Sequence, residues 1–401
     1  MFNSLKFKVI LFGFIFTFFS SFGQSYFLGL FNSSIREALS ITHGQFGSIF
    51  ASATLCSSLL LIWVGKKIDD VNIFKFAFFV TILLSFACFF FSRITSVFLL
   101  FIGIFLMRFS GQGMMSHTAS TTISRYFTRT RGRALSISWF GLSSAEFIMP
   151  VLMVYLLTII DWQNLWLIFS ITVLIVLPIV SFLLIKNLNL DSREANDEDK
   201  KEVEIKQWKR REVIKDYRFY IISSNMLAMP WIFTGFAVFQ SFIQTSKGWG
   251  PYVIAQSFMS YSILSVLTLF LSGFLIDKFT SRKLLIYMNI PLLLSVIVLF
   301  FFDTPVTAFV FLGLVGISNG FANILGSSTW AELYGVKYLG SIKALTTALM
   351  VFATAFGTAL FGYLIDIGFT VSDIAVVSGT YIFISLILLF FVRKKLNPVI
   401  I

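Results

Sequence analysis

The chain contains twelve apolar runs of roughly 20 residues each, separated by shorter polar segments. An α-helix rises about 1.5 Å per residue, so one such run spans the hydrocarbon core of a bilayer. The runs lack the period-two alternation of transmembrane barrel strands. Because only helices and closed barrels satisfy the backbone in lipid, the sequence predicts an all-α membrane protein.

We expect the twelve spans at residues 8–30, 45–65, 73–92, 97–122, 134–159, 163–186, 217–244, 251–276, 283–302, 306–331, 342–365 and 371–392. The first span follows Lys6 and Lys8 and resembles a signal peptide. Ser20 to Gln24 lack a small-x-small cleavage site, which favours a retained first span.

The chain is 57% hydrophobic and 12% charged, so the lipid bilayer is its expected main partner. Its net charge of +12 is distributed unevenly between the expected loops. With the N-terminus in the cytoplasm, 27 of the 31 Lys and Arg residues lie on the cytoplasmic side, against three outside. This bias predicts that both termini are cytoplasmic and removes the need for a nucleic-acid partner.

Three landmarks recur at one sequence offset, which indicates a duplicated unit. Gly65, Tyr126 and Gly132 correspond to Gly273, Tyr334 and Gly340, each 208 positions later. A polar segment at 188–215 divides the chain into six-span halves at 1–187 and 216–401, and we interpret it as a cytoplasmic linker. Its later part, with Val203, Ile205, Trp208 and Val213, could form a helix on the membrane surface or a charged loop.

Several motifs fall at the expected loops and span ends. They are Gly65-x-x-x-Asp69, Gly273-x-x-x-Asp277-Lys278 with Arg282, and Arg108 followed by Gly111, Gln112 and Gly113. With these motifs the chain resembles the major facilitator superfamily over essentially its full length. Segments 125–150 and 331–366 are similar to the monocarboxylate-porter and oxalate–formate antiporter branch. The named substrates of that branch do not transfer, because its charged residues in spans eight and eleven are not matched.

The resemblance implies two pseudo-symmetric six-helix bundles that alternate access to a site near the midplane. The loop motifs then suggest a conformational latch that breaks and reforms as the halves rock. Its expected members are Gly65, Asp69, Gly273, Asp277, Lys278 and Arg282. A static loop contact is the simpler alternative for the same residues.

Arg108 and Glu146 are the charged residues expected deep in the membrane. Arg108 lies about eleven residues into its span, or roughly 16 Å, and a lone Arg there costs at least about 2.5 kcal/mol. Glu146 lies at a similar depth in span five, so we expect the two to pair or share a water. They form either a permanent tie between helices or a substrate site, in which a carboxylate displaces Glu146 and Glu146 takes up a proton.

Uncharged polar residues at membrane depth complete the candidate substrate site. In the fold that the resemblance implies, spans one, four, seven and ten line the central cavity. Those spans carry Gln24, Gln112, Trp231, Gln240, Asn319 and Asn323. Hydrogen bonding between helices is the alternative for each residue.

No catalytic, nucleotide-binding or metal-binding motif stands out, so we expect no enzyme activity, cofactor or metal. The sequence favours secondary transport of a small organic anion across a bacterial inner membrane, by proton coupling or exchange. The alternatives are export of apolar drugs and a sensor that kept the fold without transport. A monomer is compatible with this fold.

Overall fold

The structure is a computed structural model that describes residues 4–127, 130–186 and 206–398. Every regular element in these ranges is helical, and twelve helices are long and apolar enough to cross a membrane. This confirms the all-α membrane fold expected from the apolar runs. The chain forms two compact units, Met1–Glu198 and Asp199–Ile401, and the division falls inside the polar segment 188–215.

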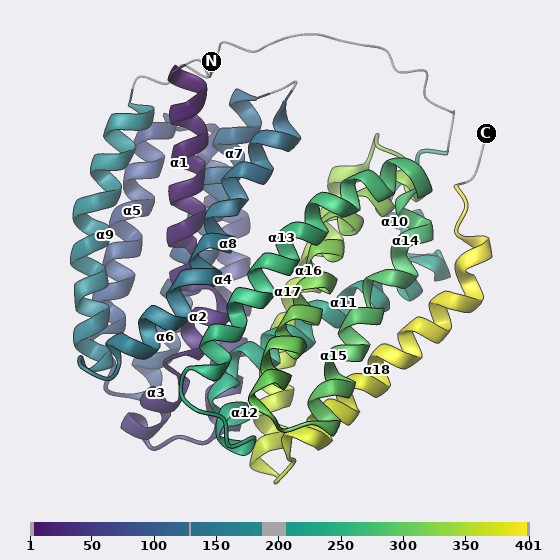
Figure 1. Ribbon diagram of the computed structural model, residues 1–401. Helices are drawn as coiled ribbons and strands as arrows, with labels where there is room; N and C mark the ends of the chain where they lie inside the picture. The colour runs from purple at the N-terminus through teal and green to yellow at the C-terminus, as the bar shows by residue number, and fades with distance from the viewer. Residues whose placement is uncertain (1–3, 128–129, 187–205, 399–401) are drawn as a thin grey trace. The chain divides into compact units, whose positions relative to one another are not determined.

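Each unit contains six spans, some of which are interrupted (Figure 1). The first unit contains α1 (Ser4–Ser20), η1 (Ser21–Gly23), α2 (Ser25–Gly29), α3 (Asn32–Leu39), α4 (His43–Val64), η2 (Gly65–Asp69), α5 (Ile73–Phe91), α6 (Val97–Met107), η3 (Arg108–Met115), α7 (Ser116–Tyr126), α8 (Arg131–Leu156) and α9 (Trp162–Ile185). The second contains α10 (Arg210–Val213), α11 (Tyr217–Val238), α12 (Gln240–Ser246), α13 (Val253–Phe279), α14 (Ser281–Met288), α15 (Ile290–Phe301), α16 (Pro305–Tyr334), α17 (Leu339–Asp366), α18 (Val371–Val392) and η4 (Arg393–Lys395).

The two units repeat one pattern of helix pairing. In the first unit α1 packs against α8, α4 against α6, and α5 against α9. In the second unit α11 packs against α17, α13 against α16, and α15 against α18. In each unit the first span therefore pairs with the fifth, the second with the fourth and the third with the sixth. The shared pattern is what the sequence landmarks at one offset predict.

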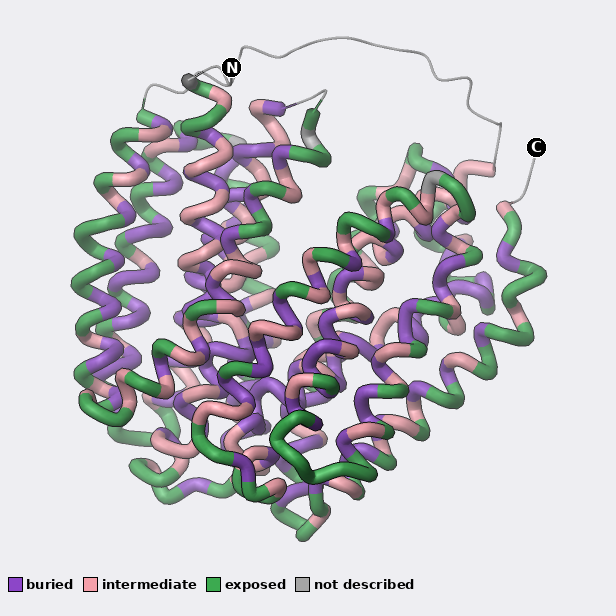
Figure 2. The backbone as a smooth tube through the Cα atoms, viewed as in Figure 1, coloured by how far each residue is buried: buried purple, intermediate pink, exposed green. Residues whose placement is uncertain are grey.

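Burial follows the helix faces within each unit (Figure 2). Large apolar side chains such as Phe79, Ile179 and Phe391 are exposed, while Phe12, Leu84 and Trp166 are fully buried. In water an exposed apolar surface of this kind would be unstable, but lipid solvates it without cost. The outward apolar faces are therefore consistent with a bilayer as the solvent of both units.

Two spans of the first unit are irregular where they approach one another. Span one is interrupted at Gln24, whose extended backbone (φ −78°, ψ 151°) separates η1 from α2. Span four passes from α6 into the π-helix η3 at Arg108 before it continues as α7. A Cβ on Gly23 would lie 2.3 Å from both the Met107 carbonyl oxygen and the Gln112 nitrogen. Glycine at this position therefore lets the two backbones touch.

The surface helix considered for the end of the linker is wrong for the part of it that the structure describes. Only Arg210–Val213 is helical, which is a single turn. Val213 is completely buried in the core of the second unit, and Trp208 packs against that core. Val213 is therefore covered by protein, and Trp208 is partly covered, so neither forms the apolar face of a surface helix.

Candidate functional site

Arg108 is buried in the first unit and is held by three neutral oxygens. Arg108 is the first residue of η3, and it is 3% exposed. Nε donates to Thr54 Oγ1 of α4 at 3.1 Å, and Nη1 donates to the Gly23 carbonyl at 3.0 Å and to Ser25 Oγ at 3.1 Å. The guanidinium also lies over the Phe50 ring, 5.2 Å from its centroid. Spans one, two and four therefore meet at one cation.

The interruption of span one explains why a backbone carbonyl is available to Arg108. In a continuous helix the Gly23 oxygen would accept a hydrogen bond from the residue four positions later. The extended backbone of Gln24 redirects the chain, and the Gly23 oxygen accepts from Arg108 instead. The local break in the helix therefore frees a backbone carbonyl to accept a hydrogen bond from the buried guanidinium.

The direct ion pair expected between Arg108 and Glu146 is not formed. Among the residues that the structure describes, Arg108 has no ion-pair partner, and its hydrogen bonds all go to neutral groups. Glu146 of α8 is 9% exposed. Arg108 and Glu146 lie at similar depths along spans four and five, but depth does not specify the direction in which each side chain points.

Gln24 and Gln112 flank the contact between spans one and four. Both side chains are half-buried. Gln24 directly follows Gly23, and Gln112 lies four residues after Arg108 in η3. The first unit thus brings Arg108, Gln24 and Gln112 to the region where spans one and four approach each other.

The second unit contains a cavity of about 380 Å³. Asn319 and Asn323 of α16 line it, as does Ser223 of α11. Asn319 Nδ2 donates to Ser265 Oγ at 2.9 Å, which ties α16 to α13. Asn323 is exposed, so its carboxamide is available to a ligand.

Two predicted residues lie away from this cavity. Trp231 packs in an aromatic cluster, with its ring centroid 5.2 Å from that of Tyr381 and 6.1 Å from that of Phe361. Gln240 is 5% exposed, and its Nε2 donates to the Ala237 carbonyl at 2.9 Å. Neither residue is among those that line this cavity, and the contacts given above place both against other parts of their own unit.

Sequence reasoning missed one wall of the cavity. Lys343, Thr346, Thr347 and Met350 of α17 all line it. They follow one another at the i, i+3, i+4, i+7 spacing of a helix face, a signal that was present in the sequence. Four methionines also line the cavity, namely Met226, Met229, Met288 and Met350. Their flexible side chains suit an adaptable apolar surface.

The loop motifs make local contacts at the end of each unit that carries most of its basic residues. In the first unit, His117 Nε2 lies 3.0 Å from the Gly65 carbonyl, and Arg125 Nη1 donates to the Ile68 carbonyl at 3.1 Å. Both donors come from span four, which therefore holds the loop after span two. The side chain of Asp69 lies outside the part of the structure that can be described.

In the second unit, Arg282 Nη1 donates to the Leu396 carbonyl and to Asn397 Oδ1, each at 3.0 Å. The Glu332 carboxylate accepts from the backbone of Ser281 at 2.8 Å and thereby caps α14. Lys278 lies over the Phe279 ring, 5.3 Å from its centroid. Among the described residues, no atom beyond the chain neighbours and nearby helix backbone of Gly273 would lie within 4 Å of a Cβ there. The side chain of Asp277 is outside the described residues.

Comparison with known proteins assigns the fold. The chain is similar over 97% of its length to a bacterial homologue of the human lysosomal transporter Spinster, in an inward-facing and occupied conformation. That match has a TM-score of 0.73 at 13% identity and covers 96% of the other chain. The nucleoside transporter NupG matches 98% of this chain and 99% of its own, with a TM-score of 0.69 at 15% identity. No curated protein sequence matches the chain.

The family assignment is independent of these structural similarities. The sequence profile of the Major Facilitator Superfamily matches residues 13–265 and 220–400, which together cover nearly the whole chain. The family and the folds that the chain shares are those of non-enzymatic membrane transporters. By its sequence profile and its twelve-helix fold, this protein belongs to the major facilitator superfamily.

Proposed function

We propose that this protein is a secondary active transporter for a small organic anion, a carboxylate, with Arg108 as its anion-binding group. Transport proceeds by alternating access of the two units and is driven by a proton gradient or by exchange. The protein resides in a bacterial inner membrane, with the basic ends of both units and both termini in the cytoplasm. The resemblance to the monocarboxylate-porter and oxalate–formate antiporter branch agrees with this substrate class.

The observation that carries the proposal is a positive charge held in place without a counter-charge. Three hydrogen bonds fix the Arg108 guanidinium through Nε and Nη1, while Nη2 makes no hydrogen bond among the described residues. Neutral oxygens orient a guanidinium but leave its charge uncompensated at membrane depth. A carboxylate ligand would supply that charge and accept from the unused N–H groups.

Glu146 is proposed as the proton carrier of the cycle. It is a buried carboxylate in the same unit as Arg108, and the two do not pair in this structure. A buried carboxylate favours its neutral form, so proton uptake accompanies movement of the site away from water. Gln24, Gln112, Asn319 and Asn323 are proposed to hydrogen-bond the substrate.

The proposed latch consists of Gly65, Asp69, Gly273, Asp277, Lys278 and Arg282. In the second unit, the bonds from Arg282 to Leu396 and Asn397 offer a set of contacts that could break and reform. In the first unit, the Gly65 carbonyl is held by His117 of span four.

The cavity of the second unit supports a second candidate, export of apolar compounds. Its lining includes four methionines together with Phe233 and Trp330. Such a surface accommodates varied apolar ligands without a specific charge. This candidate predicts transport that is independent of Arg108.

The test is a thermal-shift screen of the purified protein against small carboxylates, followed by uptake into proteoliposomes. We expect a carboxylate to stabilise the protein and Arg108→Gln to weaken its binding by about 10- to 100-fold, since a charged hydrogen bond contributes roughly 1.5–3 kcal/mol. Arg108→Lys keeps the charge but not the planar fork, so we expect intermediate binding. Thr54→Val removes only the hydroxyl that accepts from Arg108 Nε. Thr81→Val is the matched control, because the Thr81 hydroxyl donates to the Phe78 carbonyl within its own helix.

Carboxylate binding that is unchanged in Arg108→Gln would overturn the anion site. Stabilisation by apolar compounds alone, with flux that persists in this variant, would establish export of apolar compounds instead. Ligand binding without flux in proteoliposomes would indicate a sensor. Glu146→Gln tests coupling separately, because it should remove the dependence of uptake on an imposed pH gradient while carboxylate binding persists.

A further inference from the structure

The described end of the linker, Lys206–Asp216, runs across the loop that joins α16 to α17, and we call it the strap. Two hydrogen bonds fasten it to the end of α16 and to that loop. The Trp208 backbone nitrogen donates to the Tyr334 carbonyl at 3.0 Å, and Gln207 Oε1 accepts from the Lys337 backbone nitrogen at 2.9 Å. Tyr334 is the last residue of α16, and Lys337 lies in the loop, so the strap holds the backbone on both sides of Gly335.

Gly335 shows how closely the strap and the loop fit. Its backbone is left-handed, with φ at +81°. A Cβ at this position would lie 2.3 Å from Gln207 Oε1. The conformation of the loop therefore favours glycine, and the Gln207 carboxamide occupies the space in which a larger residue would place its Cβ.

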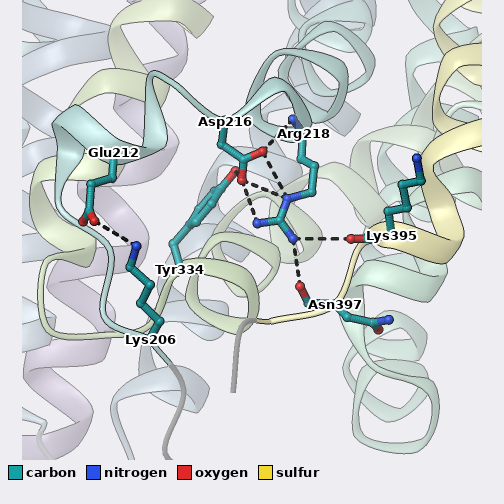
Figure 3. Close-up of polar contacts among 7 residues, drawn as sticks. All are labelled: Lys206, Glu212, Asp216, Arg218, Tyr334, Lys395 and Asn397. Atoms are coloured by element: carbon teal, nitrogen blue, oxygen red, sulfur yellow. Dashed lines mark hydrogen bonds and ion pairs between the residues drawn. The ribbon is translucent and has the colours of Figure 1, made fainter. Parts of the chain in front are cut away.

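The far end of the strap is fixed by a charged network (Figure 3). Asp216 Oδ2 accepts from the Tyr334 hydroxyl at 3.1 Å and from Arg218 Nε at 2.8 Å. Arg218 Nη1 also donates to the carbonyl oxygens of Asn397 at 2.8 Å and Lys395 at 3.3 Å. The network joins the strap, α16 and the chain beyond α18. Tyr334 is bound by the strap at both its backbone and its hydroxyl.

Aromatic packing continues from the strap to the cavity. The Trp208 ring meets the Tyr334 ring at a centroid distance of 5.4 Å, and Tyr334 stacks on Trp330 at 5.9 Å with an interplanar angle of 10°. Trp330 lines the cavity, and both Trp330 and Tyr334 are almost completely buried. The Trp208–Tyr334 and Tyr334–Trp330 ring contacts therefore connect the strap to Trp330 in the cavity wall.

We propose that the strap is a built-in conformational device that holds the α16–α17 loop and Trp330 in place and thereby restricts access to the cavity of the second unit. Helices α16 and α17 carry most of the polar lining of the cavity, including Asn323, Lys343 and Thr347. The bonds from Gln207 and Trp208 must break before the loop between these helices can move away from the strap. The linker thus has a task beyond joining the two halves, whichever substrate the protein carries.

The test measures how fast a thiol placed in the cavity wall reacts with a water-soluble maleimide in the full-length reconstituted protein. Ser223→Cys is nearly isosteric, and Ser223 lines the cavity while being only 7% exposed. The reporter cysteines are placed in a variant with Cys56→Ser and Cys88→Ala, which removes the native thiols. Ser372→Cys, beside a separate hollow formed with Lys247 and Asp303, provides the reference rate.

We expect Trp208→Ala and Gln207→Ala to raise the reaction rate at position 223 by about fivefold or more relative to position 372, a typical size for coupling between sites. Tyr334→Phe, which removes only the hydroxyl bond to Asp216, should give a smaller increase. Arg211→Ala is the matched control within the strap, because the Arg211 side chain is exposed. Its rate should change by less than about twofold.

The proposal fails if Trp208→Ala and Gln207→Ala lower the unfolding temperature but leave the ratio of the two rates unchanged, because the strap would then only stabilise the fold. Equal acceleration at positions 223 and 372 would also overturn it, since that pattern indicates general loosening. If Trp208→Ala does not fold, Gln207→Ala and Tyr334→Phe decide the question by the same ratio. None of these outcomes depends on the identity of the substrate.

Discussion

The two units share a helix-pairing pattern but use their polar residues in opposite ways. The first unit buries a single cation, Arg108, against the oxygens of Thr54, Gly23 and Ser25. The second unit contains a cavity of about 380 Å³, with carboxamides and hydroxyls set among methionines. Duplication therefore preserved the scaffold while the polar chemistry diverged. We propose that Arg108 of the first unit recognises the charge of a substrate, whereas the cavity of the second unit accommodates apolar groups.

The largest effect should come from glycines that separate touching backbones. A Cβ at Gly23 would meet Met107 O and Gln112 N at 2.3 Å, and one at Gly357 would meet the Trp231 carbonyl at 2.0 Å. We expect Gly23→Ala and Gly357→Ala each to destabilise the protein by about 3 kcal/mol, measured as a loss of unfolding temperature in detergent. Only Gly23→Ala should also weaken carboxylate binding by the remaining folded protein, because Gly23 supplies an oxygen to Arg108. Equal weakening by both variants would contradict the division of tasks between the units.

An intermediate effect should separate the two asparagines of the cavity. Asn323 is exposed to the cavity, whereas Asn319 is bonded to Ser265. We expect Asn323→Ala to weaken ligand binding by about five- to tenfold without altering stability, since a typical hydrogen bond contributes about 1 kcal/mol. Asn319→Ala should instead destabilise the fold by about 0.6 kcal/mol, the average for a hydrogen bond between membrane helices. Thermal unfolding with and without ligand measures both, and the reverse pattern would reassign the two side chains.

The smallest effect concerns the exposed ion pair at the start of the strap. Glu212 accepts from the Lys209 backbone and from Lys206, and these bonds lower the pKa of its carboxyl below the ordinary value of 4.5. The lowered pKa contributes stability above pH 4.5, and that contribution is lost as the pH falls through the folded-state pKa. The unfolding temperature of the native protein should therefore fall slightly more below this pH than that of Glu212→Gln. Parallel curves for the two proteins would show that the ion pair has no part in holding the strap.

Much of the architecture could be predicted because it depends on composition along the chain. Apolar runs long enough to cross a bilayer must become helices in lipid, whatever their neighbours are, so twelve spans follow from run length alone. The duplicated landmarks at Gly65 and Gly273 likewise predicted a duplicated unit, and the two units share one pairing pattern. Arg108 is buried in the first unit, and Asn323 lines a cavity of the second unit.

The partners of these residues could not be predicted in the same way. Arg108 and Glu146 lie at similar depths, yet Arg108 bonds Thr54, Gly23 and Ser25 because span one is interrupted and span four is a π-helix there. Trp231 lies on a span expected to line a cavity, but it faces an aromatic cluster of its own unit.

The sequence by itself determined the solvent, the number of spans and the duplicated organisation, because these depend on how many apolar residues follow one another. Only the tertiary structure decided which oxygens hold Arg108, which helix faces line the cavity and where the end of the linker is fastened. Those contacts depend on helix rotation and on local breaks in the helical hydrogen-bond pattern. A rotation of one residue, about 100°, turns a side chain to a different neighbour without altering the hydropathy of the run.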